Sequence, residues 1–388
     1  MLLVLLGALA IRLAAPGSCR LFTGAGFRPL ARLPLRLAGR AVETATAEVG
    51  AATLAEGILG PKAEEELNHV GLPPLRKRTF LVTGATSGIG RATVEMLAKE
   101  GCTILVHGRD EGRMRHLMDK FGRLYRNATF DGFEADLSSM EDVEEMVELI
   151  RERHPVIHGI LHNAATMDGG LSGKKKITWE QEEQTIAVNV LAPFLLTAGL
   201  LPNLRASGAG RVIFSGSATM TGGQYLDDLD FERKWSGIHA YSLSKLADAM
   251  MAEEMHQRYG DAPRLTFHSI DPGMADTKLA RHGVSFARGH RKGRAQTVQR
   301  LVYGTLPNAK TAKASFKALT EDAFQETSGG RLDTENGQKY IEDAAEREIL
   351  WEELERRTEA EWPVPPKLLA AAGDSAKEAA VPVAEDAA

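Results

Sequence analysis

The chain has 388 residues, of which 43% are hydrophobic and 26% charged, an ordinary globular composition. The formal net charge is −5, so no overall basic field favours nucleic acid as a partner. Only two cysteines occur, Cys19 and Cys102, which excludes a disulfide scaffold, and no cysteine and histidine spacing indicates a metal site.

Residues 1–72 are predicted to be a targeting leader and linker. An apolar run from Leu2 to Ile11 is too short to span a bilayer and ends at Arg12. More arginines follow, and no acidic residue precedes Glu43. An apolar segment followed by an arginine-rich, acid-poor stretch is typical of a bipartite plastid leader, with a mitochondrial presequence or an endoplasmic reticulum anchor as alternatives. We therefore expect an organellar location, with the plastid favoured.

Residues 73–362 are predicted to form one domain in which strands and helices alternate. Short apolar runs predict strands at residues 79–84, 103–108, 156–165, 210–218 and 264–273. Helical periodicity predicts helices at residues 91–101, 141–153, 178–203 and 239–259. Continuous apolar strands separated by helices indicate a doubly wound α/β fold, a parallel sheet with helices on both faces. Such sheets bind ligands beyond the carboxyl ends of their strands.

Two further segments have unusual composition. Residues 363–388 are rich in alanine and proline and contain no aromatic side chain, which predicts a disordered tail. Residues 279–294 are a basic stretch. Charge runs usually face water, so a solvated loop is the plain interpretation. The functional interpretation is a surface for an acidic substrate or a peripheral contact with an anionic membrane.

A glycine-rich turn, TGATSGIGRA, lies between the first predicted strand and the first predicted helix, with Gly84, Gly88 and Gly90. Glycine lets the backbone approach a pyrophosphate closely and lets the helix pack closely on the strand. The helix that follows would direct its N–H groups at the phosphates. The spacing therefore predicts a dinucleotide-binding loop, with a tight strand-to-helix connection as the plain alternative.

The end of the second predicted strand, HGRDEGR, bears on the choice of dinucleotide. Folds that use NAD usually place an acid here for the ribose 2′-hydroxyl, whereas an arginine accommodates the 2′-phosphate of NADP. Arg109 directly follows the strand, and Arg91 follows the last glycine of the loop. Two cations near one predicted phosphate favour NADP(H) over NAD(H).

The stretch AYSLSKLA places Tyr241 and Lys245 one helical turn apart on the same face. A free tyrosine has a pKa of about 10, too high for easy proton exchange at neutral pH. A lysine ammonium one turn away favours the phenolate, which makes a tyrosine a better acid. The plain alternative is a lysine whose stem covers a half-buried tyrosine.

Together, these motifs resemble the short-chain dehydrogenase/reductase superfamily over roughly residues 77–345. VNVLAPF, RVIFSGSA and YSLSK match its catalytic segments, so the resemblance implies catalytic roles for Asn189, Ser217, Tyr241 and Lys245. TGATSGIG, ADLSS, HNAA and DPGMADT match its cofactor-binding segments. The positions that the resemblance assigns to the cofactor are Gly84, Thr86, Ser87, Gly88, Ile89, Gly90, Arg109, Asp136, Leu137, Asn163, Ala164, Tyr241, Lys245, Pro272, Gly273 and Thr277.

The chain departs from the usual motifs at several positions. His162 and Ala165 replace the first asparagine and the glycine of N-N-A-G. Ser215 and Ser217 flank a glycine where the family usually has two adjacent serines, and spacing along the strand favours Ser217 as the catalytic one. The long gap from Ser217 to Tyr241 resembles retinol dehydrogenases, WW-domain oxidoreductases and protochlorophyllide reductases.

The resemblance implies an NADP(H)-dependent oxidoreductase that interconverts a carbonyl and an alcohol on a small lipophilic substrate by hydride transfer. Two alternatives stay open: a plastid reductase similar to protochlorophyllide reductase, and a non-catalytic NADP(H)-binding subunit. The only expected ligand besides the cofactor is the small carbonyl or alcohol, and a homodimer is compatible with the family. His107, His158 and His162 lie in or beside predicted strands and are expected to be packed rather than catalytic.

Overall fold

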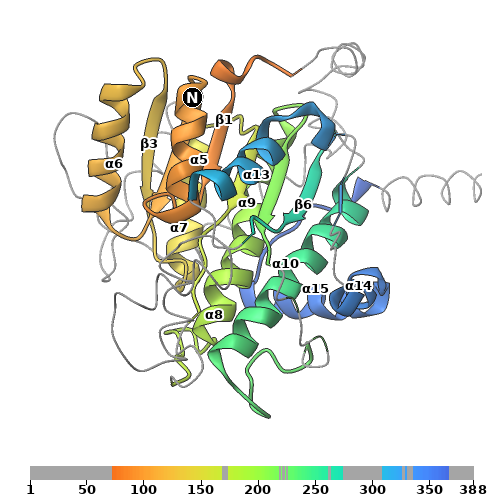
Figure 1. Ribbon diagram of the computed structural model, residues 1–388. Coiled ribbons are helices and arrows are strands. Elements are labelled where there is room, and N and C mark those ends of the chain that lie inside the picture. Colours follow the sequence, from red (N-terminus) through yellow and green to blue (C-terminus); the bar gives the residue numbers. More distant parts are fainter. Residues whose placement is uncertain are drawn as a thin grey trace, which may run out of the picture. The chain divides into compact units, whose positions relative to one another are not determined.

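The computed structural model describes residues 72–167, 174–217, 220, 223, 226–260, 264–273, 308–325, 328–329 and 335–366 (Figure 1). The chain divides into two compact units between Pro73 and Pro74, and almost all described residues belong to the second. The predicted leader up to residue 71, Thr277, the basic stretch 279–294 and the tail from residue 367 lie outside the described residues.

The second unit is built on a six-stranded parallel sheet with the order β3-β2-β1-β4-β5-β6. The strands are β1 (Thr79–Val82), β2 (Thr103–Gly108), β3 (Thr129–Glu134), β4 (Gly159–His162), β5 (Arg211–Ser215) and β6 (Thr266–Ile270). Leu81 of β1 pairs with Leu105 of β2 on one side and with Ile160 of β4 on the other. The strand order therefore reverses at β1, and such a switch point is where doubly wound sheets bind ligands.

Helices cover both faces of the sheet (Figure 1). They are α5 (Gly88–Lys99), α6 (Glu111–Leu124), α7 (Met140–Arg153), α8 (Gln184–Ile186), a π-helix η3 (Ala187–Leu191), α9 (Ala192–Arg205), α10 (Gly237–Tyr259), α13 (Asn308–Thr320), α14 (Glu335–Glu342) and α15 (Ala344–Thr358). The short 3-10 helices are η2 (Leu75–Lys77) and η5 (Asp322–Gln325). Side chains alternate along each strand, so Phe80 and Val82 join one core while Leu81 joins the other. The predicted doubly wound α/β fold is confirmed.

The central helical segment Gln184–Arg205 is apolar enough to satisfy a test for membrane-spanning helices, but 83% of its apolar window is buried inside the protein. It is apolar on all sides because it packs against the sheet on one side and neighbouring helices on the other. The helix was predicted to begin near residue 178, and that start is wrong. Glu183 accepts hydrogen bonds from the N–H groups of Thr185 (2.7 Å) and Ile186 (3.0 Å), and this cap sets the start at Gln184.

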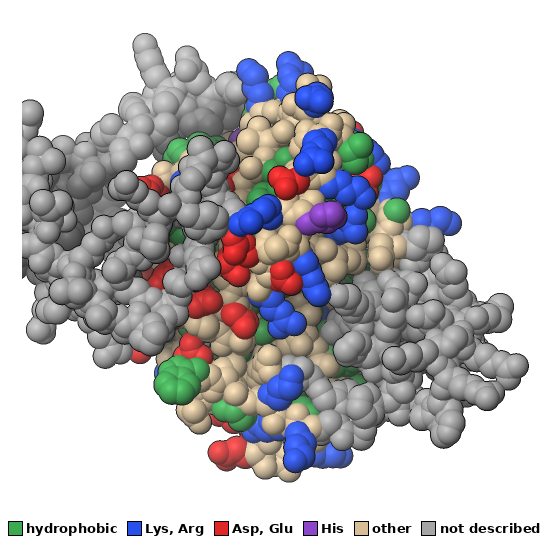
Figure 2. Space-filling model, turned by 90° about the vertical axis from the view of Figure 1, so that its left-hand side faces the viewer, with side chains coloured by type: hydrophobic (Ala, Val, Ile, Leu, Met, Phe, Trp, Pro, Cys, Tyr) green, Lys and Arg blue, Asp and Glu red, His purple; other side chains and the backbone are tan. Residues whose placement is uncertain are grey.

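Five of the described α-helices and strands were not predicted from the sequence: α6, β3, α13, α14 and α15. The sequence of β3, TFDGFE, contains two acids and a glycine, because β3 is an edge strand with only part of its side chains buried. It therefore lacks the continuous apolar run that identified the central strands. The face carrying α6 and β3 mixes basic and acidic side chains, with Lys and Arg gathered in its upper part (Figure 2).

Trp362 and Pro363, near the end of the described residues, contact the core. Trp362 forms ring contacts with Trp351 (4.8 Å between centroids), Phe194 (5.0 Å) and Tyr259 (5.3 Å). The Tyr259 hydroxyl donates to the Pro363 carbonyl at 2.9 Å. The ordered packing therefore reaches the first residue of the predicted tail.

Candidate active site

The turn between β1 and α5 requires glycine at two positions. Gly84 and Gly88 have φ angles of +63° and +57°, in the left-handed region that favours glycine. A Cβ at Gly84 would also lie 2.9 Å from the Cα of Ala164. The turn is therefore pressed against the residues that follow β4, and the predicted loop and the HNAA segment lie together.

Close packing between the turn and the residues after β4 also explains why position 90, in the first turn of α5, is a glycine. A Cβ there would lie 2.5 Å from Nδ2 of Asn163 and 2.6 Å from the carbonyl oxygen of Gly84. The N-cap residue of α5, Ser87, makes no side-chain cap hydrogen bond. Thr86 and Ile89 are half-buried and Ser87 is exposed. The open N-terminus of this helix is suited to a phosphate, so the observed turn fits a dinucleotide.

Hydrogen bonds join the turn to the end of β4. Asn163 donates through Nδ2 to the carbonyl of Thr83 at 3.1 Å. The Thr83 hydroxyl oxygen accepts from the N–H groups of Asn163 and Ala164, both at 3.0 Å. This network holds the backbone of the two predicted cofactor segments in one arrangement.

His107 braces the turn from the side of β2, a role that the sequence did not reveal. Its Nδ1 accepts from the Gly84 N–H at 3.2 Å, so its Nε2 carries the proton and donates to the Ala135 carbonyl at 3.1 Å. Burial lowers the pKa of His107 to about 4, which keeps the ring neutral. His107 is thus packed, as predicted, and it also positions the first glycine of the loop.

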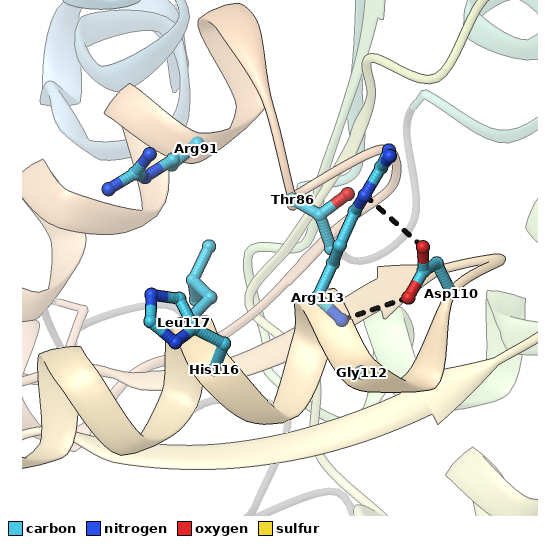
Figure 3. Close-up of a pocket in the computed structure, with 7 residues that line it drawn as sticks. All are labelled: Thr86, Arg91, Asp110, Gly112, Arg113, His116 and Leu117. Atoms are coloured by element: carbon cyan, nitrogen blue, oxygen red, sulfur yellow. Dashed lines mark hydrogen bonds and ion pairs between the residues drawn. The ribbon is translucent and has the colours of Figure 1, made fainter.

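Basic side chains line a cavity of about 370 Å³ beside the turn. In Figure 3, Arg91 reaches across from α5 toward α6, where Arg113 lies over Thr86 and His116 faces the same gap. The Arg113 guanidinium is paired with Asp110 at 3.1 Å. Arg109 is exposed after the end of β2 and does not line this cavity. Arg113 and His116 were missed, although Arg113 lies one helical turn after Arg109.

Asp136 and Leu137 follow β3 at the same edge of the sheet. Asp136 is exposed, and its Oδ1 accepts from the N–H (3.0 Å) and hydroxyl (2.9 Å) of Ser138. Its own N–H donates to Asp142 at 2.9 Å. Leu137 is buried. This turn holds the Asp136 carboxylate at the surface, where a ligand could reach it.

Tyr241 and Lys245 lie on α10. The Lys245 side chain is buried, and the Tyr241 side chain is half-buried. The Lys245 ammonium lies 5.8 Å from the centre of the Tyr241 ring. It also donates to Asp248 at 2.8 Å. Burial lowers the pKa of Lys245, but the Asp248 carboxylate outweighs that effect, so the net shift of this pKa is upward. Lys245 is therefore an ammonium facing the tyrosine.

Asn189 is connected to the same turn of α10. It belongs to the π-helix η3, a rare geometry that is frequent at functional sites. Its Nδ2 donates to the Ser244 hydroxyl at 2.9 Å, and that hydroxyl donates to the Tyr241 carbonyl at 2.8 Å. Its Oδ1 accepts from the Thr166 N–H at 2.8 Å. Asn189 therefore links the segment after β4 to the helix carrying Tyr241.

The two candidate serines differ in position. Ser215 is the last residue of β5, and its hydroxyl is buried with no hydrogen-bond partner among the described residues. Ser217 lies two residues later and is half-buried. Between them, the Gly216 N–H donates to the Ile270 carbonyl at 2.7 Å. Ser217 thus lies beyond the carboxyl end of the strand, where a ligand is expected in this fold.

The segment after β6 completes the described part of the site. Gly273 has a φ angle of +78°, and its N–H donates to Asp271 at 2.8 Å. Pro272 is half-buried. The structure thus describes every predicted site residue except Thr277. Most of them lie in the segments that directly follow the strands, whereas Asn189 lies on η3 and Tyr241 and Lys245 lie on α10.

Two buried histidines lie in or beside β4. His162 contacts the Thr197 hydroxyl at 2.9 Å and stacks on Phe214 with 5.0 Å between ring centroids. Burial, and secondarily the charge of Lys245, lowers the pKa of His162 to about 3. His158 accepts from the Thr79 N–H at 3.1 Å. Both are packed, as predicted.

Comparison with known proteins identifies the family. The sequence profile described as short chain dehydrogenase matches residues 78–285. Polyprenol dehydrogenase of Mus musculus is 34% identical over 301 residues, covering 75% of this chain and 84% of that protein. Retinol dehydrogenase 14 of Homo sapiens is 29% identical over 243 residues, covering 59% of this chain and 70% of that protein.

Solved structures share the architecture. A protein of Mycobacterium paratuberculosis, 24% identical, aligns with a TM-score of 0.56 over 76% of this chain and 97% of its own. The NADPH complex of an Escherichia coli CFT073 protein, 25% identical, aligns with a TM-score of 0.52 over 66% of this chain and 97% of its own. The sheet and its helices are therefore of a known type.

Proposed function

The chain belongs to the short-chain dehydrogenase/reductase family of oxidoreductases, and we propose that it uses NADP(H) to interconvert a carbonyl and an alcohol on a small lipophilic substrate. The observation that carries this proposal is the buried Lys245 ammonium beside Tyr241, on a helix bonded to Asn189. A binding protein without turnover would not need a buried ammonium beside a tyrosine ring.

The chemistry follows from the residues around one substrate oxygen. The nicotinamide supplies the hydride when the cofactor is bound. Tyr241 would donate the proton to the substrate oxygen, while the Lys245 ammonium stabilises the phenolate that remains. Ser217 would donate a hydrogen bond to the same oxygen as charge develops on it. Asn189 would hold a water through which Lys245 regains contact with solvent protons.

Support for NADP(H) comes from the residues beside the glycine turn. Arg91, Arg113 and His116 surround the cavity into which a phosphate near Thr86 would extend. Guanidinium groups bind phosphate oxygens through charge-assisted hydrogen bonds. Arg109, at the end of β2, remains a candidate for the 2′-phosphate from the side of the strand.

Support for a lipophilic substrate comes from the relatives. Polyprenol dehydrogenase and retinol dehydrogenase 14 are named for long, apolar alcohols. Purified full-length protein should therefore oxidise NADPH in the presence of one or more members of a panel containing retinal, a polyprenal, a steroid ketone, a quinone and aliphatic aldehydes. Tight NADPH binding without turnover of any carbonyl would favour the non-catalytic alternative. Turnover of protochlorophyllide only in light would favour the plastid alternative.

We also propose that residues before about 72 direct the protein to an organelle, because an apolar run precedes an acid-free, arginine-rich stretch. A fluorescent reporter fused behind this segment should enter an organelle, with the plastid first among the candidates. A reporter that stays in the cytosol would show that the segment is not a leader.

A further inference from the structure

A buried acid lies next to the lysine of the candidate site. Asp248 is three residues after Lys245 on α10, and the two side chains form an ion pair with 2.8 Å between Nζ and Oδ2. Each side chain is only 3% exposed. The second carboxylate oxygen, Oδ1, is buried and has no hydrogen-bond partner among the described residues.

A buried ion pair of this kind is not an efficient way to stabilise a fold. Burying two charges costs more than their attraction returns in many proteins, and apolar replacements are often equally stable. An unpartnered buried carboxylate oxygen adds a further cost. The Asp248 carboxylate contacts the ammonium that faces Tyr241, so a role in the chemistry accounts for its position.

We propose that Asp248 is a positioning residue that holds the Lys245 ammonium and extends the proton-donating form of the Tyr241–Lys245 pair to higher pH. The proposal rests on the proposed function of the same site. Asp248 contacts the Lys245 ammonium, and that ammonium faces Tyr241. A carboxylate at this position makes the loss of a proton from these two groups less favourable, whichever of them loses it.

The consequence concerns the direction of the reaction. Reduction of a carbonyl needs the protonated pair, whereas oxidation of an alcohol needs the pair to accept a proton. By keeping the pair protonated, Asp248 favours the rate of carbonyl reduction at neutral and mildly alkaline pH. Burial raises the pKa of Asp248 itself to about 6 and outweighs Lys245, which lowers it. This pKa is still below 7, so the carboxylate is charged at neutral pH.

The other titratable groups on elements that pack against α10 have partners of their own or lie near its far end. On the site side, His162 of β4 is neutral and Glu183 before α8 accepts from Trp235 at 3.1 Å. His268 of β6 contacts the Phe324 carbonyl at 3.0 Å. At the far end of α10, Arg347 of α15 pairs with Glu254 at 2.9 Å. Among the described residues, Glu348 of α15 pairs with Arg258 of α10, and Arg211 of β5 donates to the Ala318 carbonyl. The helix α14 carries Lys339, Tyr340 and Glu342.

The test compares Asp248→Asn with the wild type. The amide keeps the shape of the side chain and removes its charge. With NADPH and a carbonyl substrate, the alkaline limb of the kcat profile should move to lower pH by about one unit or more, since one charge within 3 Å of the ammonium is lost. Glu254→Gln is the matched control, because it breaks another buried ion pair of α10 away from Tyr241 and should leave the limb in place.

The proposal is overturned if the alkaline limb of the kcat profile lies at the same pH in Asp248→Asn and in the wild type. It is also overturned if Glu254→Gln shifts this limb as far as Asp248→Asn does. Thermal melting verifies that each variant is folded, and Asp248→Ala replaces the asparagine variant if that one does not fold. A second readout needs no substrate. The phenolate absorbance of Tyr241, isolated by subtracting the spectrum of Tyr241→Phe, should appear at a lower pH in the Asp248 variant than in the wild type. If no carbonyl is turned over, the proposed function fails, and this titration alone decides: an unmoved midpoint refutes the role of Asp248.

Discussion

Gly90 lies so close to the carbonyl oxygen of Gly84 that a Cβ at position 90 would be 2.6 Å from it. The start of α5 is therefore packed directly on the turn that precedes it. Nδ2 of Asn163 also lies against Gly90 and donates to the Gly84 carbonyl. The peptide N–H groups of the turn and of the helix start are held together, as a pyrophosphate site requires.

Gly90→Ala should therefore damage both stability and cofactor binding. Because the neighbours are backbone and a bonded amide, the new methyl group forces them apart, and overpacking of this kind costs about 1–3 kcal/mol. Calorimetric melting and NADPH titration measure the two effects. Gly122→Ala in α6 is the control: no atom lies within 4 Å of its would-be Cβ, so the free energy of unfolding should rise by about 0.5–1 kcal/mol. Equal melting temperatures for Gly90→Ala and wild type would contradict the packing argument.

Tyr241→Phe should nearly abolish carbonyl reduction and leave NADPH affinity almost unchanged. The substitution deletes the proton donor and keeps the ring, and general acid catalysis contributes about 10²–10⁴-fold to rate. Steady-state kinetics and NADPH fluorescence separate the two quantities. Near-wild-type turnover in this variant would remove Tyr241 from the chemistry.

Lys245→Ala should behave differently from Tyr241→Phe. The family resemblance places Lys245 among both the catalytic and the cofactor-binding positions, so the variant should lose turnover and also bind NADPH more weakly. The variant also leaves the buried Asp248 carboxylate without its partner, so its melting temperature should fall. Unchanged NADPH affinity in Lys245→Ala would confine the lysine to a role at the tyrosine.

Arg109→Ala and Arg91→Ala should each weaken NADPH binding by roughly tenfold to a hundredfold. A charge-assisted hydrogen bond to phosphate contributes on the order of 1.5–3 kcal/mol, which corresponds to that range. Arg113→Ala should cost less, because Asp110 already engages its guanidinium. NADH binding should hardly change in any of the three. Arg115→Ala, whose side chain pairs with Glu111, is the control, and equal losses for NADPH and NADH would place the arginines away from the 2′-phosphate.

Acid should destabilise the fold through the buried histidines. The folded-state pKa is about 4 for His107 and about 3 for His162, below the ordinary value of 6.5, because burial disfavours the charged ring. The unfolded chain therefore binds protons first, so this stability is present above pH 6.5 and is lost as the pH falls toward 4. Each histidine should contribute a loss of on the order of 1–3 kcal/mol.

Urea unfolding at pH 6.5 and pH 4 measures this loss. Carboxylates titrate in the same interval, so the contribution of one histidine is read from the difference between the wild type and His162→Asn, which cannot take up the proton. The variant should lose less stability than the wild type over this interval. Identical losses would show that His162 is not held neutral in the fold.

The sequence alone determined the features that depend on residues close together in the chain. Apolar runs and helical periodicity predicted the doubly wound fold, and an α-helix places Tyr241 and Lys245 on one face. The glycines at 84, 88 and 90 predicted a tight turn: the first two adopt backbone angles that few other residues adopt, and the third leaves room for close packing. The edge strand β3 was missed because only part of its side chains are buried and its apolar pattern is weak. The helix α6 was missed although its buried residues Met114, Leu117 and Phe121 recur at helical spacing.

Only the tertiary structure decided which distant residues support the site. His107 braces Gly84 because β2 lies beside β1, and Asn189 reaches Ser244 because η3 lies against α10. Asp248 is visible in the sequence beside Lys245, but a surface helix would expose both to water, where such a pair has little effect. Packing of α10 against β5 and β6 removes that water, and burial makes the carboxylate act strongly on the ammonium. The sequence specifies the groups, and the sheet order determines the dielectric surroundings in which they act.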